Sequence, residues 1–115
     1  MTRVNNDFHP HGSDLSVREI KDLFKYHFDG VNLQYLTGTK IKDIEIIGSR
    51  VWGQPKPFSD LDILVRYEGR ANPQDLKDLF AMSNNRLDIG GLETDITFTK
   101  DPIEKWLNDS VNNLK

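Results

Sequence analysis

The stretch that decides the fold is residues 47–65, IGSRVWGQPKPFSDLDILV. It joins a run of isoleucines to a second apolar run through a loop that begins at Gly48-Ser49 and contains two prolines. The second run opens with Asp60 and Asp62, although strand interiors disfavour aspartate and side chains two residues apart on a strand point the same way. Two carboxylates on one face repel each other, so this pair predicts a positively charged ligand between them.

The segments on either side of this loop have the composition of β-strands. Residues 41–47 contain four isoleucines, whose β-branched side chains favour a strand. Residues 61–67 alternate, so that Leu61, Ile63 and Val65 share one face while Asp60 and Asp62 share the other. We therefore expect two strands joined by the Gly-Ser loop, at the centre of the fold.

A third strand is predicted at LETDITFT, residues 92–99. The alternation gives this strand an apolar face and an acidic face. The apolar face takes every second residue from Leu92 to Phe98, and the other face carries Glu93, Asp95 and Thr97. If this strand neighbours residues 61–67, the carboxylate of Asp95 joins those of Asp60 and Asp62.

Helices are expected before, between and after these strands. Ser16 and Glu19 form a capping box that begins a helix over 16–28, with an apolar stripe at Val17, Ile20, Leu23, Phe24 and Phe28. Asn72-Pro73 and Asp101-Pro102 each place a cap before proline, which predicts two further helices. The first is expected to end by Asn84 or Asn85, and the second to turn Ile103, Trp106, Leu107 and Val111 inward. Residues 29–40 have no clear assignment. This order predicts an α+β fold, with a small mixed sheet flanked by helices in layers.

Composition limits the class of protein. The 115 residues indicate one domain over 14–115, preceded by a flexible arm at 1–13 in which His9 and His11 are expected to be solvated. A net charge of −3 disfavours a nucleic acid as substrate, and the absence of cysteine excludes thiolate metal sites. No apolar run resembles a membrane span or a signal peptide, so the expected location is the cytoplasm.

The residues around the loop suit phosphate and metal chemistry. Gly48 lets the backbone approach a ligand closely, and Ser49 offers a hydroxyl and an N–H to an anion. Carboxylate oxygens are the ligands that magnesium prefers. Three neighbouring carboxylates repel each other unless their charge is offset, so such a cluster predicts two metal ions between them. Glu93 and Asp88 are rivals of Asp95 for the third position, which we assign to Asp95 because apolar or β-forming residues flank it.

Taken together, these motifs resemble the signature of the polymerase-beta-like nucleotidyltransferases. That signature is a hydrophobic residue, Gly-Ser, about ten residues, and then Asp, a hydrophobic residue and Asp. Ten residues separate Ser49 from Asp60 here, the spacing of the minimal nucleotidyltransferases found beside HEPN-domain toxins, and TDITF resembles the family's third acidic strand. The resemblance covers roughly residues 41–98.

The resemblance implies a role for each residue that matches. Gly48, Ser49 and Arg50 would bind the triphosphate of a nucleotide, which is expected to be ATP. Asp60, Asp62 and Asp95 would be catalytic and would hold two Mg²⁺ ions, or Mn²⁺ in their place. Lys56 is a weaker candidate for the phosphates. Trp52 departs from the family pattern and would either stack on a base or pack the loop onto the domain.

The resemblance also implies what receives the nucleotide. The expected reaction transfers AMP to a hydroxyl acceptor by a two-metal mechanism, with a HEPN-type toxin as the protein partner and an antitoxin role for this chain. Two alternatives remain open at this point. One is a non-catalytic antitoxin that only binds its partner, and the other is an aminoglycoside-type transferase whose pocket is completed by a partner or by a homo-oligomer.

Overall fold

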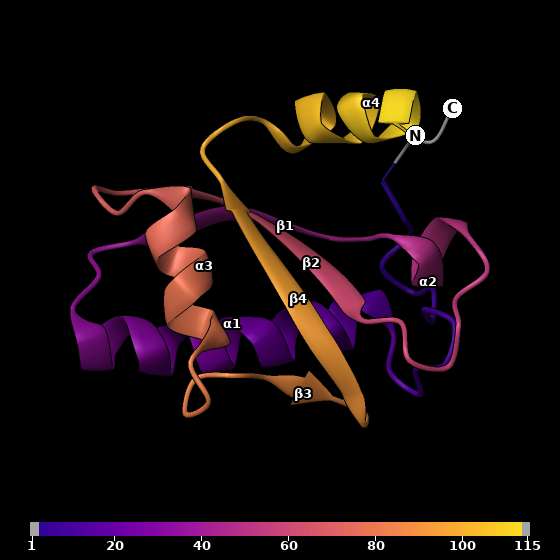
Figure 1. Ribbon diagram of the computed structural model, residues 1–115, viewed down its shortest axis with the longest axis horizontal. Coiled ribbons are helices and arrows are strands. Elements are labelled where there is room, and N and C mark those ends of the chain that lie inside the picture. The colour runs from indigo at the N-terminus through magenta and orange to yellow at the C-terminus, as the bar shows by residue number, and fades with distance from the viewer. Residues whose placement is uncertain (1–2, 114–115) are drawn as a thin grey trace.

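The computed structural model describes residues 3–113, and their side chains as far as residue 108. Its elements form one mixed α/β layer structure (Figure 1). In chain order they are α1 (Val17–Tyr35), β1 (Lys40–Ile47), α2 (Ser49–Trp52), β2 (Leu61–Glu68), α3 (Pro73–Ala81), β3 (Asp88–Ile89), β4 (Leu92–Thr99) and α4 (Ile103–Asn113). This arrangement confirms the expected fold class of a small mixed sheet flanked by helices.

The four strands form a sheet in the order β1-β2-β4-β3. β1 and β2 are antiparallel neighbours, β2 and β4 run parallel, and the short β3 pairs antiparallel with the start of β4. The parallel pair is connected through α3, as expected for a crossover between parallel strands. β2 and β4 therefore begin at the same end of the sheet, where the loop after α2 also arrives (Figure 1).

The alternation along β2 divides the core between the two faces of the sheet. Leu61, Ile63 and Val65 pack with the buried residues of α1 and α3 in the main core. Leu64 points the other way and forms a smaller cluster with residues of β1 and α4, namely Ile47, Ile103 and Leu107. The face that carries Asp62 is therefore the face covered by α4, and only part of it is apolar.

Helix α1 is longer than the expected 16–28, because it continues to Tyr35 through the segment that had no assignment. The capping box of Ser16 and Glu19 is present as predicted. Gly30 does not end the helix, since Phe28 and Val31 on either side of it are buried and their packing outweighs the roughly 1 kcal/mol that glycine costs in a helix. Leu23, expected inward, is 46% exposed.

Three other boundaries or orientations differ from expectation. Helix α3 ends at Ala81, before the asparagines at 84 and 85 that were expected to end it. The short elements α2 and β3 were not predicted. In α4, Ile103 and Leu107 are buried as expected but Trp106 is 37% exposed, because the helix contacts the sheet through a narrow stripe at i and i+4. The side chain of Val111 lies outside the described residues. None of the described helices is both long and apolar enough to cross a membrane.

The segment expected to be a flexible arm lies against the domain over residues 3–13. Val4 and Phe8 pack on the main core, and the carbonyl of Phe8 accepts a hydrogen bond from the N–H of Val17 at 2.8 Å. The N–H of His11 donates to the carbonyl of Arg50, also at 2.8 Å. The composition of this segment suggested a loose tail, but its two apolar side chains and its backbone hydrogen bonds connect it to the start of α1 and to α2.

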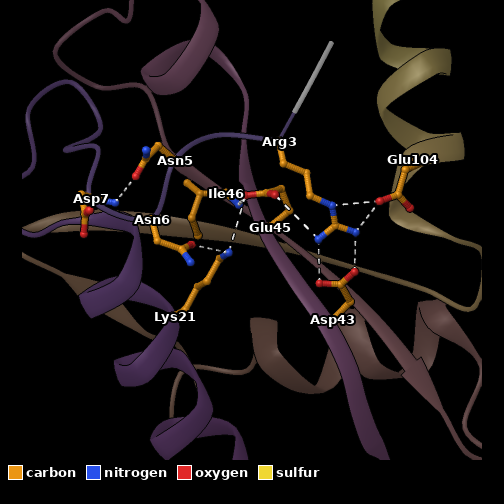
Figure 2. Close-up of polar contacts among 9 residues, drawn as sticks. All are labelled: Arg3, Asn5, Asn6, Asp7, Lys21, Asp43, Glu45, Ile46 and Glu104. Atoms are coloured by element: carbon orange, nitrogen blue, oxygen red, sulfur yellow. Dashed lines mark hydrogen bonds and ion pairs between the residues drawn. The ribbon is translucent and has the colours of Figure 1, made fainter.

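Arg3 joins this segment to β1 and α4 (Figure 2). Its guanidinium donates to Asp43 and, through Nε at 2.9 Å, to Glu104. It also lies 3.9 Å from Glu45, a buried carboxylate that forms a second ion pair with Lys21 at 3.8 Å. The hydrogen bonds from Arg3 lower the pKa of Asp43, whereas burial raises the pKa of Glu45. Arg3 therefore pairs with three carboxylates, those of Asp43 and Glu45 on β1 and that of Glu104 on α4.

Replacing Arg3 by alanine should lower the free energy of unfolding by about 1–2 kcal/mol at neutral pH, since it leaves those carboxylates without their shared counter-ion. Urea unfolding at low and at high salt measures this, and the loss should shrink in about 1 M NaCl, where charges are screened. Arg18→Ala is the matched control, because Arg18 forms only an exposed 3.5 Å pair with Asp7. Equal losses in both variants would show that the Arg3 network contributes nothing specific.

Candidate active site

Asp62 and Asp95 lie directly opposite each other on neighbouring strands. They are register partners in the parallel pair of β2 and β4, and both point away from the main core. Asp62 is half-buried and Asp95 is exposed. Asp60, which is exposed, precedes β2 by one residue and shares the alternation of Asp62. The fold therefore places the third predicted carboxylate beside the first two, although more than thirty residues separate them in the chain.

Gly48 lies directly against the carboxylate of Asp62. Its backbone has φ 89° and ψ −166°, a conformation essentially confined to glycine. A methyl group built on Gly48 would overlap Asp62 Oδ2 and would lie 2.9 Å from Asp62 Cγ. The sequence suggested that this glycine admits a ligand, and the structure shows that it first of all makes room for Asp62.

The environment of Asp62 disfavours its charged form. Burial raises the pKa of Asp62 to about 6, with further increases from the nearby carboxylates of Asp95 and Asp60. Lys77 and Arg50 oppose this increase without cancelling it. A carboxylate with a raised pKa in a group of acids is a common property of functional sites, because the group is arranged for a ligand rather than for stability.

Lys77 is a residue of this site that no sequence pattern predicted. It comes from α3, and its ammonium lies 3.2 Å from Asp95 Oδ1 and 3.4 Å from Thr97 Oγ1, both on β4. It is therefore the counter-ion of Asp95 within the chain itself. Lys77 directly follows the buried Leu76 of α3, but nothing local in the sequence says that a helical lysine reaches a strand about twenty residues further on.

The donor set suits a hard divalent cation, although the side chains are not gathered around one. Among the described residues, no three His, Cys, Asp or Glu side chains are arranged so that they could hold a metal ion. Carboxylate oxygens are the ligands that Mg²⁺ prefers, and one or two carboxylates with substrate phosphates are its usual shell. Asp62 and Asp95 with Asp60 fit that chemistry, because a cation among them would offset the repulsion that raises the pKa of Asp62.

Arg50 does not face the site as expected for a phosphate ligand. It is 4% exposed, and its guanidinium donates to backbone carbonyls only. Its Nε and Nη2 bond the carbonyl of Ser59 at 2.9 and 2.7 Å, and its Nη1 bonds that of His11 at 2.7 Å. Arg50 therefore fastens the loop 53–60 and the N-terminal segment to α2, and the prediction that it binds the triphosphate finds no support in these contacts.

Arg50→Lys should lower the free energy of unfolding by about 2–3 kcal/mol, because the buried lysine cannot reproduce the planar fork that now donates to the carbonyls of Ser59 and His11. Thermal or urea unfolding measures the loss. The exposed Arg70 supplies a matched control, since Arg70→Lys should change stability by less than about 0.5 kcal/mol. If Arg50→Lys were as stable as Arg70→Lys, the guanidinium would not be what holds the loop.

The other predicted residues are placed as follows. Ser49 is half-buried at the first position of α2, directly after Gly48. Trp52 packs against the smaller apolar cluster below α4, so it fastens the loop to the domain, the second of its two expected roles. Lys56 is exposed. Of the rivals of Asp95, Glu93 pairs with Arg86 at 3.5 Å and Asp88 lies opposite Glu93 on β3, so neither is the register partner of Asp62.

Comparison with known proteins agrees with this geometry. A scan against protein-family models matches residues 33–113 to the model described as nucleotidyltransferase domain, which is well over half of the 115 residues. The matched segment contains the Gly48-Ser49 turn, Asp60, and the strands that carry Asp62 and Asp95. Searches of curated proteins and of solved structures found no match. The chain therefore belongs to the nucleotidyltransferase domain family and is a transferase of the nucleotidyl-transfer type.

Proposed function

We propose that this chain transfers AMP from ATP to a hydroxyl group of a protein partner. The observation that supports this most is the register of Asp62 with Asp95, combined with the packing of Gly48 against Asp62. Two segments far apart in the sequence thus supply carboxylates to one surface beside a Gly-Ser turn. Asp60 and Asp95 are exposed and Asp62 is half-buried, so a protein acceptor can approach the carboxylates from outside.

The chain's own groups divide the work of the reaction. The N–H and hydroxyl of Ser49 hold the triphosphate, and Asp60, Asp62 and Asp95 would hold Mg²⁺. Two Mg²⁺ ions held by these carboxylates would supply positive charge that offsets the negative charge developing during the transfer. Asp95 orients the acceptor hydroxyl and accepts its proton as the new oxygen–phosphorus bond forms at the α-phosphate. The bond between the α-phosphorus and the bridging oxygen breaks, and pyrophosphate leaves with the electron pair.

The class of the partner follows from the resemblance to minimal nucleotidyltransferases. In that group the neighbouring gene encodes a HEPN toxin, so the proposed acceptor is a hydroxyl side chain of such a protein and the proposed role is that of an antitoxin. The acidic surface of the site suits an acceptor that is not itself a polyanion, since a net charge of −3 would repel one.

Transfer of label from ATP tests this proposal. The chain is incubated with Mg²⁺, the protein encoded by its neighbouring gene, and ATP labelled at either the α- or the γ-phosphate. We expect the α-label, and not the γ-label, to become attached to the partner, and Asp62→Asn to abolish the transfer. Transfer of the γ-label alone would indicate a phosphotransferase, and equal transfer by Asp62→Asn would contradict the assigned site.

Two further experiments separate the two other functions. If an Asp60→Ala/Asp62→Ala variant neutralised the partner in cells as well as the original chain does, binding alone would explain the function. If the label moved to an aminoglycoside and not to the protein, the acceptor would be a small molecule. Either result would overturn the protein acceptor while leaving the family assignment intact.

A further inference from the structure

We propose that Phe58 forms one wall of a pocket that binds the nucleobase of the donor nucleotide, an inference that rests on the proposed function. Phe58 is 96% exposed, the most exposed of the large apolar side chains in the described residues. The other aromatic side chain of this region, Trp52, packs against the apolar cluster that the sheet forms with α4. The aromatic ring that is free to meet a ligand is therefore Phe58.

The turn that carries Phe58 is held firmly. The N–H of Lys56 donates to Ser59 Oγ and the N–H of Ser59 donates to the carbonyl of Lys56, both at 3.0 Å. Arg50 binds the carbonyl of Ser59 from the buried side. The ring is thus presented by an anchored turn, so little conformational entropy remains to be lost when a ligand stacks on it.

A pocket of about 280 Å³ lies between this turn and the turn that begins β4. Its apolar walls are Pro57, Phe58 and Leu92, and its polar groups include Asp60 and Glu93. Pockets for drug-sized ligands span roughly 300–1,000 Å³, so this one suits a single heterocycle better than a whole nucleotide. Because Asp60 borders both the pocket and the carboxylate site, a base held here would belong to the nucleotide bound at that site.

The charges of the pocket favour a base over phosphate. The carboxylate of Asp60 is assigned to Mg²⁺, so the carboxylate left to meet a base is that of Glu93, which also pairs with Arg86 at 3.5 Å. A carboxylate accepts hydrogen bonds from N–H groups, whereas phosphate oxygens have none to donate. Adenine, guanine and cytosine carry an exocyclic amino group, whereas uracil does not. Phe58 and Gly91 both line the pocket, and apart from the chain neighbours of Gly91 no atom lies within 4 Å of the point where a Cβ of Gly91 would stand, so a flat ring has room there. The pocket therefore selects a neutral, amino-bearing base, in agreement with ATP as donor.

Calorimetric titration of the original chain and of four variants with two probes tests this inference. Phe58→Ala should weaken binding of ATP with Mg²⁺ by about 10- to 100-fold, the range for loss of one base–aromatic stack, and leave binding of inorganic tripolyphosphate unchanged. Phe58→Tyr should retain ATP binding, and Phe58→Leu, which is apolar but has no π-face, should not. Tyr26→Ala, a control at an 84% exposed aromatic side chain on α1, should bind like the original chain.

The outcomes separate this inference from the function on which it rests. If the original chain binds ATP and Phe58→Ala binds it equally well, the base does not lie against Phe58 and the inference is wrong. It is also wrong if Phe58→Ala weakens association with the protein partner and not with ATP. If the original chain binds neither ATP nor tripolyphosphate, the proposed function itself fails.

Discussion

Asp62→Asn is expected to stabilise the fold while it abolishes nucleotide transfer. The pKa of Asp62 lies at about 6 in the folded chain, against an ordinary value of 3.8, chiefly because the group is half-buried. At about pH 7 the folded state must therefore hold a carboxylate that its surroundings disfavour. Asparagine removes that cost, so the free energy of unfolding should rise by about 1–2 kcal/mol after allowance for solvent screening.

The pH dependence gives the sign of this effect. Between about pH 4 and 6 the folded chain keeps a proton on Asp62 that the unfolded chain has released, so stability falls as pH rises through this window. The advantage of Asp62→Asn should be complete above about pH 7 and small at about pH 4, as measured by urea unfolding at both values. Asp22→Asn, at an exposed position of α1, is the matched control and should change stability at neutral pH by less than about 0.5 kcal/mol. If Asp62→Asn lowered stability at neutral pH, the conclusion that the buried carboxylate of Asp62 destabilises the fold would be wrong.

The same substitution should lower the rate of transfer at least about 10³-fold. Stabilisation of transition-state charge by bound metal contributes several kcal/mol, and each 1.36 kcal/mol is about a factor of ten in rate. A variant that is more stable and yet inactive would show that Asp62 is retained for chemistry at the expense of stability. An inactive variant that is also less stable would leave a structural role as the simpler explanation.

Gly48→Ala is expected to lose both stability and activity. The backbone at φ 89° costs about 1–3 kcal/mol for a residue with a side chain, and the added methyl group overlaps the carboxylate of Asp62. We expect a total loss of about 3 kcal/mol or more in the free energy of unfolding, measured by urea titration. Transfer should fall as well, because Asp62 has to move from its place beside Asp95.

A matched glycine and a double variant make this result interpretable. Gly30 lies in α1, and an added Cβ there would meet no atom within 4 Å, so Gly30→Ala should stabilise the helix by about 0.5–1 kcal/mol. Gly48→Ala/Asp62→Ala removes the overlap but keeps the backbone strain, so it should be less destabilised than the sum of the two single variants. Strict additivity would mean that Gly48 and Asp62 do not interact as described.

The parts of the site that the sequence predicted well are those set by local patterns. Alternation along residues 61–67 and 92–99 predicts which face Asp62 and Asp95 occupy, and strand pairing then places them together. The capping box of α1 was predicted for the same reason, since its two partners lie three residues apart. A pattern of this kind is carried by neighbouring residues and requires no knowledge of the rest of the chain.

The parts that were missed depend on contacts between distant elements. Lys77 reaches Asp95 from a helix that packs on the opposite face, and Arg50 turns to carbonyls of the loop and of the N-terminal segment. A basic residue after Gly-Ser is compatible with either a phosphate or a carbonyl as its partner. Only the tertiary packing decides between these two partners. Tertiary packing also decides that Trp52 packs against the domain while Phe58 is exposed.

Binding of ATP to the isolated chain, with and without Mg²⁺, tests most directly whether the Gly48-Ser49 turn and the three carboxylates form one site. Calorimetry requires no acceptor, so an unknown partner does not affect the result. We predict one ATP bound per chain in a Mg²⁺-dependent manner, with binding at least about tenfold weaker for Asp62→Asn and for Asp95→Asn. Binding that is independent of Mg²⁺, or unchanged in both variants, would contradict a site built from β2 and β4.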